Sequence, residues 1–164
     1  MLHMCREGDS YLEYLRGHLD IDNRFSDIPT CLFCKIIKRE IPSTKIFETD
    51  LSYAFLDIGP LSEGHSLVIP KYHAKFLHEL PDEYLADLLP VAKKVAIATG
   101  ADQYNILQNN GPLAHQVVEH VHFHVIPKPN ETEGLGIKWP SKQPTIDEVE
   151  ATGKKMLEKL QSNS

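Results

Sequence analysis

Apolar residues recur along residues 31–127 at two spacings, and each spacing predicts a type of element. Phe33, Ile36 and Ile37 indicate a short helix that ends before Pro42. Five shorter runs have the composition of strands. They lie at 46–47, 53–56, 66–69, 104–108 and 118–126. Turn-forming residues separate the first three runs, so we expect these to form a meander.

A longer helical pattern begins after Pro81. Apolar side chains recur at helical spacing from Leu85 to Ala96, acidic residues occupy the first turn, and Gly100 follows the end. Pro90 lies inside the pattern, and we expect it to kink or split the helix. About five strands with one central helix predict an α+β domain.

Both ends of the chain differ in composition from this core. Residues 1–29 are polar, with a capping-box spacing at Ser10, and we expect a weakly held helix or disorder there. Residues 30–140 form the predicted domain, whose last part is rich in proline and glycine. In the extension 141–164, the spacing from Thr145 to Glu148 predicts the start of a final helix.

Composition narrows the classes of function. The 164 residues are 41% apolar and 24% charged, which fits one globular domain. A net charge of −6 argues against a duplex-DNA binder. No apolar run approaches the roughly 20 residues that span a bilayer, and the N-terminus lacks a signal-peptide segment. We therefore expect a soluble protein of the cytosol or nucleus, with no membrane partner.

Histidines are the informative residues, because seven of nine lie between positions 65 and 124. In the run HVHFHVI, strict alternation puts His120, His122 and His124 on one face of a strand and apolar side chains on the other. The middle imidazole of such a row suits covalent or acid–base chemistry. A metal site and a solvated polar face are the alternatives that the row leaves open.

Five segments together resemble the histidine triad family of nucleotide-binding hydrolases and transferases. They are CLFCKII at 31–37, AFLDI at 54–58, GHSLVIPKYH at 64–73, QNNG at 108–111 and HVHFHVI at 120–126. Within that family the chain is most similar to the fungal members of the Hint branch, which are purine nucleoside phosphoramidases. The resemblance implies a five-stranded antiparallel sheet, with a long helix and a short N-terminal helix, in a homodimer that forms one continuous sheet.

The resemblance also implies a role for each of four histidines. In the family, the residue at the position of His122 attacks the α-phosphorus of an AMP–amine substrate. The nucleotidyl-histidine that forms is then hydrolysed to release AMP. By the same resemblance His124 contacts the phosphate, His120 helps to hold the tautomer of His122, and His65 lines the inner side of the site.

Further positions match substrate-binding residues of the family. Asp57 matches the carboxylate that accepts hydrogen bonds from the ribose, and Asn109 matches an amide beside the phosphate. The apolar residues that match the walls around the purine are Phe33, Ile36, Phe55 and Ile58. The phosphate loop also contains Gln116, but it departs from the family: His115 replaces a glycine, and Val117 replaces a serine or threonine whose hydroxyl faces the leaving group.

Cys31 and Cys34 are separated by two residues, a spacing that alone fits a redox pair, half of a zinc site or two core thiols. Family members with this pair bind zinc through it, together with residues that match His73 and His120. The resemblance therefore implies a structural zinc, while the chemistry itself needs no cofactor.

Two rival functions use the same residues. One is the hydrolysis of dinucleoside polyphosphates or another nucleotidyl transfer through His122. The other is a nucleotide-binding scaffold with weak catalysis, which the missing hydroxyl at Val117 favours.

Overall fold

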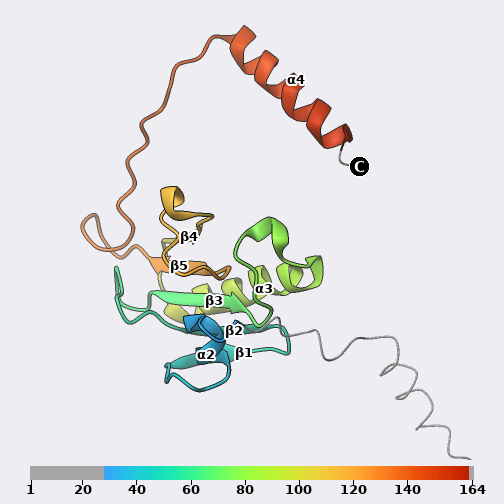
Figure 1. The fold of residues 1–164 in the computed structure, drawn as a ribbon. Helices are drawn as coiled ribbons and strands as arrows, with labels where there is room; N and C mark the ends of the chain where they lie inside the picture. The colour runs from blue at the N-terminus through green and yellow to red at the C-terminus, as the bar shows by residue number, and fades with distance from the viewer. Residues whose placement is uncertain (1–27, 163–164) are drawn as a thin grey trace, which may run out of the picture.

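The computed structural model describes residues 28–162 and has an α+β fold (Figure 1). Five antiparallel strands form one sheet in the order β1-β2-β3-β5-β4. The elements are α2 (Leu32–Ile37), β1 (Lys45–Glu48), β2 (Ser52–Leu56), β3 (Ser66–Pro70), η2 (Leu77–Glu79), α3 (Asp82–Thr99), β4 (Tyr104–Gln108), η3 (Pro112–Ala114), β5 (Phe123–Pro127) and α4 (Ile146–Ser162). The predicted fold class, meander and five-stranded antiparallel sheet are confirmed. The helix or disorder expected within residues 1–29 lies, up to residue 27, outside the described residues.

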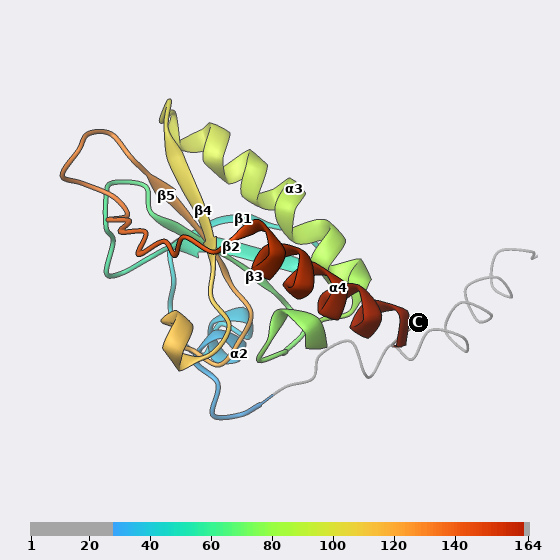
Figure 2. The same ribbon diagram turned by 90° about the horizontal axis from the view of Figure 1, so that it is seen from above.

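The two faces of the sheet are covered by different helices, α3 on one side and α2 on the other (Figure 2). Side chains alternate along each strand, so Ala54 and Val68 pack with α3 while Phe55 and Leu67 pack with α2. Strands β2 and β3 are therefore apolar on both faces, and the α2 face is the one that carries the site.

Helix α3 runs unbroken through Pro90, so the predicted split is wrong. A proline removes one helical hydrogen bond and leaves the carbonyl four residues earlier without a donor. Both Pro90 and Ala86, which carries that carbonyl, are exposed, so water can bond the freed oxygen. The helix ends as predicted at Gly100, which adopts φ 69°.

The last strand is shorter than the apolar alternation predicts. Run 118–126 was expected to be extended throughout, but β5 begins at Phe123, because β3 pairs only with residues 123–125. Before that point the N–H of Val121 donates instead to the carbonyl of Ala74, at 2.7 Å. The alternation of faces persists, since Val121, Phe123 and Val125 all enter the core against α3.

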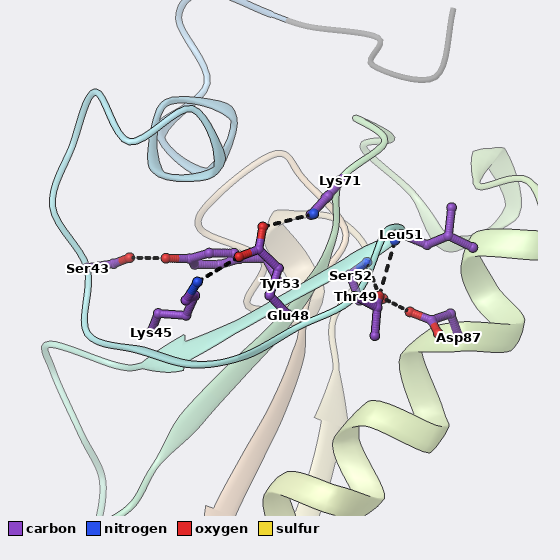
Figure 3. A network of polar contacts seen from close by, with 9 residues as sticks. All are labelled: Ser43, Lys45, Glu48, Thr49, Leu51, Ser52, Tyr53, Lys71 and Asp87. Carbon is purple, nitrogen blue, oxygen red and sulfur yellow. Dashed lines mark hydrogen bonds and ion pairs between the residues drawn. The ribbon is translucent and has the colours of Figure 1, made fainter. Parts of the chain in front are cut away.

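A polar network fixes the turn between β1 and β2 (Figure 3). Thr49 Oγ1 donates to Asp87 Oδ2 on α3 at 2.6 Å. The carboxylate of Glu48 bonds Lys45 Nζ at 2.8 Å and Lys71 Nζ at 2.9 Å. The turn is thereby tied both to the long helix and to the end of β3.

Helix α4 stands away from the domain at the end of an extended segment (Figure 1). It begins where the sequence predicts, with a capping box in which Glu148 Oε2 accepts from the N–H of Thr145 at 2.8 Å and Thr145 Oγ1 accepts from the N–H of Glu148 at 3.4 Å. None of the helices within residues 28–162 has the length and apolarity needed to cross a membrane.

Candidate active site and metal centre

A pocket of about 310 Å³ opens on the α2 face of the sheet and gathers most of the predicted site residues. Those on its wall are Phe33, Ile36, Phe55, Asp57, Ile58, His115, Val117, His122 and His124. The other predicted residues, Asn109, Gln116, His65 and His120, are absent from this wall. The pocket therefore combines an apolar wall with a carboxylate and three imidazoles.

His122 is held in one tautomer by the backbone. Its Nδ1 lies 2.6 Å from the carbonyl oxygen of His120, and because a carbonyl only accepts, Nδ1 carries the proton. Nε2 is then the nitrogen with a free lone pair. Burial lowers the pKa of His122, so the ring stays neutral near pH 7. The ring of Phe33 packs edge-on against it, with 5.2 Å between the ring centroids. A buried, neutral, oriented imidazole is suited to act as a nucleophile.

A relay of hydrogen bonds orients His124. The N–H of Leu61 donates to His65 Nδ1 at 3.1 Å, so the proton of neutral His65 is on Nε2. That N–H donates to His124 Nδ1 at 3.0 Å, which leaves the proton of His124 on Nε2. Burial lowers the pKa of both rings, that of His124 to about 4. His124 therefore offers the pocket a neutral N–H donor.

The same relay bears on metal binding by Asp57, His65 and His124, whose ligand atoms lie within 4.8 Å of one another. A metal between them would need a lone pair on His65 Nε2, which the bond from Leu61 keeps protonated. We therefore assign this group to hydrogen bonding. One oxygen of Asp57 accepts from the N–H of Gly59 at 2.8 Å, and the carboxylate reaches the pocket as an acceptor.

The loop that follows β4 is held by side chains behind the pocket. Gln116 is buried, and its amide accepts from the N–H of Gly111 and donates to the carbonyl of Lys75, both at 2.7 Å. Asn109 Nδ2 donates to the carbonyl of His115 at 3.5 Å. His115 itself adopts the left-handed conformation, with φ 65°. These amides fix the loop that presents the imidazole of His115 to the pocket.

Four predicted metal ligands converge behind the histidine row. Cys31 Sγ and Cys34 Sγ lie 3.5 and 3.7 Å from His120 Nδ1, and Cys34 Sγ lies 3.4 Å from His73 Nδ1. Tetrahedral zinc, with bonds of about 2.3 Å to sulfur and 2.0–2.1 Å to nitrogen, separates its ligand atoms by roughly 3.5 Å. His120 Nε2 donates to the carbonyl of Pro70 at 2.9 Å, which leaves Nδ1 free to coordinate. The donor set fits zinc.

Burial also sets the protonation of this cluster. It raises the pKa of the Cys34 thiol to about 11 and lowers the pKa of His120 to about 4. The imidazole is thus in the neutral form that binds metals, and a bound divalent cation would favour the thiolate.

Several residues on the wall of the pocket were not predicted from the sequence. They are Leu32, Ile41, Pro42, Ser43, Leu56, Leu67 and Val118. Leu67 lies directly opposite Phe55 in the β2–β3 register, so strand alternation could have identified it. Ser43 lies in an irregular segment and is held by the hydroxyl of Tyr53 at 3.0 Å (Figure 3). A residue in an irregular segment leaves no periodic signal in the sequence.

Comparisons with known proteins identify the family of the chain. The HIT domain matches residues 38–131. The adenosine 5'-monophosphoramidase of Schizosaccharomyces pombe is 57% identical over 80% of this chain and 98% of its own length, and that of Saccharomyces cerevisiae is 55% identical over 81% and 84%. The crystal structure of a histidine triad nucleotide-binding protein from Candida albicans covers 82% of this chain and all of its own, with 48% identity and a TM-score of 0.79. The chain therefore belongs to the histidine triad (HIT) family.

Proposed function

We propose that the protein hydrolyses the P–N bond of purine nucleoside phosphoramidates and releases AMP and an amine. The observation that carries the proposal is the single tautomer of His122, which points its lone pair away from the carbonyl of His120 and toward a pocket with an apolar wall. The names of the S. pombe, S. cerevisiae and Candida albicans relatives, adenosine 5'-monophosphoramidases, support the choice of substrate.

In the proposed reaction, His122 Nε2 attacks the α-phosphorus while the P–N bond breaks and the amine leaves with a proton. The Nε2–H of His124 donates to a phosphate oxygen, and Asp57 accepts from the ribose hydroxyls. Water then cleaves the nucleotidyl-histidine, which frees AMP and restores the imidazole. The purine lies against the apolar wall that includes Phe33 and Phe55.

We assign the leaving-group proton to His115, because Val117 has no hydroxyl to supply it. His115 is exposed, lines the same pocket as His122, and is fixed in a left-handed conformation that a residue with a Cβ adopts at some cost. Protonated His115 gives its proton to the amine and recovers one from the water that attacks the intermediate. We expect His115→Ala to slow turnover by about 10²–10⁴, the usual range for a positioned acid. A His115→Ala, Val117→Ser double variant should recover activity, and unchanged turnover in the single variant would exclude the role.

The test of the main proposal compares wild type with His122→Ala and with His78→Ala, a substitution of an exposed histidine outside the pocket. On an adenosine phosphoramidate, only the His122 variant should lose hydrolysis, and mass spectrometry of the wild type should find AMP on the peptide that carries His122. Faster turnover of a diadenosine polyphosphate would favour the rival hydrolase. Nucleotide binding without adduct or hydrolysis would favour the scaffold.

We also propose that Cys31, Cys34, His73 and His120 hold a structural zinc, since their ligand atoms meet within 4.8 Å. The zinc would tie α2 to the histidine row and supply charge that keeps the thiolates and the His120 ring in place. Metal analysis of the purified protein should find one zinc per chain, and Cys34→Ser should remove it. A wild type without stoichiometric metal would refute the assignment.

We propose a homodimer in which edge strands β4 pair across a two-fold axis to extend the sheet. β4 lies at the end of the strand order and exposes Tyr104 and Ile106, an apolar edge that a second copy would cover. Light scattering of the wild type should give twice the mass of one chain, and the Ile106→Lys variant should give the mass of a single chain. The expected place of the protein, the cytosol or nucleus, stays a prediction.

A further inference from the structure

Helix α4 carries an apolar seam whose side chains are more than half exposed. Its seam residues Ile146, Val149, Met156 and Leu160 are between 51% and 69% exposed, and no α4 side chain is buried. Together with Gly153 they are spaced alternately by three and four residues, the repeat of a helix that pairs with another helix. An exposed apolar stripe of this kind marks a surface suited to interaction with another protein chain.

The seam is nearly symmetric about its centre. Ile146 and Leu160 each lie seven residues from Gly153, while Val149 precedes it by four and Met156 follows it by three. A second α4 laid in the opposite direction therefore offers the same pattern back. Nothing lies within 4 Å of the space where a Cβ of Gly153 would stand, so the centre is open to a close approach by another helix.

Charge selects the direction of pairing. The first half of the helix carries three carboxylates and the second half three lysines with one carboxylate. These residues are Asp147, Glu148 and Glu150, then Lys154, Lys155, Glu158 and Lys159. Antiparallel copies place each acidic half against a basic half, whereas parallel copies oppose like charges. The same asymmetry also suits the dipole of a single helix, but the dipole does not account for the apolar seam.

We propose that α4 is a self-association element that binds α4 of a second copy of this chain, antiparallel and seam to seam. Such a pair has two-fold symmetry, because one surface serves both copies. It is compatible with a dimer of the catalytic domains, whose connection to α4 through the extended segment would raise the effective concentration of one helix for the other. The inference goes beyond the proposed hydrolase and does not depend on it.

The test uses two single variants of the full chain, Ile146→Cys and Leu160→Cys, treated with a short bismaleimide alone and as a mixture. Fourteen residues of helix span about 21 Å, so antiparallel pairing brings position 146 near position 160 of the second copy, while parallel pairing keeps them apart. We expect the mixture to give at least about tenfold more 146–160 product than the separate variants give of the 146–146 or 160–160 product.

Ala151→Cys, on the face of the helix opposite the seam, measures the background from random collision, and far-UV circular dichroism checks that each variant retains its helix content. Dominant 146–146 and 160–160 products would overturn the antiparallel arrangement. No product above background would overturn self-association. Products joining either position to Cys5 would identify the N-terminal segment of the chain as the occupant instead.

A charge exchange tests the basis of the pairing. Replacing the three lysines of α4 by glutamate makes the helix wholly acidic, and replacing Asp147, Glu148 and Glu150 by lysine makes it wholly basic. In the cysteine variants, each exchange alone should lose the 146–160 product, and a mixture of the two should recover it. Undiminished cross-linking by the separate variants would contradict the electrostatic argument.

Discussion

Acidification should destabilise this protein through His124, and the size of the effect follows from the hydrogen-bond relay. Burial, with the like charges that His122 and His65 would carry, lowers the pKa of His124 from 6.5 to about 4. Between these values the unfolded chain binds a proton that the folded chain does not. The free energy of unfolding therefore falls as the pH drops from about 6.5 toward 4, and this contribution changes no further below that range.

A pH of 5 lies about 1.5 units below the pKa of His124 in the unfolded chain, so protonation of the unfolded chain lowers the free energy of unfolding by roughly 2 kcal/mol. Water reaches His124 from the pocket, so we reduce this to about 1 kcal/mol. The perturbation is His124→Gln, because the glutamine carbonyl can still accept from His65 Nε2 and does not titrate. We expect wild type to lose about 1 kcal/mol more than the variant between pH 7 and pH 5.

The assay is urea unfolding, followed by circular dichroism at each pH and at fixed metal content. His78→Gln serves as the matched control, since it removes an exposed histidine that stacks on Phe76 and should retain the wild-type pH dependence. Equal losses in wild type and His124→Gln would refute the reasoning. So would a wild-type protein that gains stability on acidification.

Three further predictions concern stability, each measured by urea unfolding at neutral pH. Leu88→Ala should cost about 2–5 kcal/mol because Leu88 is fully buried, while Leu89→Ala on the same helix should change little because Leu89 is 52% exposed; equal costs would show that burial in α3 is misassigned. Thr49→Val should cost about 1–3 kcal/mol by leaving Asp87 and two backbone N–H groups without their partner, and a neutral effect would exclude the turn as a stabilising element. Phe33→Ala should cost about 3–5 kcal/mol and also lower activity, since the ring packs edge-on against the imidazole of the proposed nucleophile; loss of stability with full activity would separate packing from orientation.

Local patterns predicted most elements well, and their errors have physical causes. The strand at 104–108 and the start of α4 after Thr145 are both correct, because alternation and capping boxes are encoded by adjacent residues. The strand expected from Val118 begins only at Phe123, because its partner β4 ends at Gln108, opposite Phe123, and the N–H of Val121 bonds Ala74 instead. Pro90 was expected to kink or split the helix, but α3 continues through it, because Pro90 and the carbonyl that it leaves free, on Ala86, lie on the exposed side of the helix.

The site divides in the same way. Residues with distinctive chemistry, such as Asp57 and His122, could be predicted from motifs, and the structure places both on one pocket. Gln116 could be identified but its place could not, since one of its two hydrogen bonds joins it to Lys75, which is distant in the sequence. Ser43 was missed because it lies in the irregular segment between α2 and β1, where no periodic pattern marks the residues that face the pocket.

The position of His120 explains how the Cys/His cluster is coupled to the pocket that contains His122. One ring nitrogen faces the cysteine pair, the other donates to Pro70, and the carbonyl of the same residue fixes the proton of His122. A backbone displacement at this residue therefore moves both the ring and the carbonyl that orients the proposed nucleophile. The neighbouring Val121 is fully buried against α3, so the backbone cannot adjust by sliding one residue without forcing an imidazole into the core. The orientation of His122 thus depends on the place of His120 in the Cys/His cluster, and disruption of that cluster should impair the proposed catalysis before it unfolds the domain.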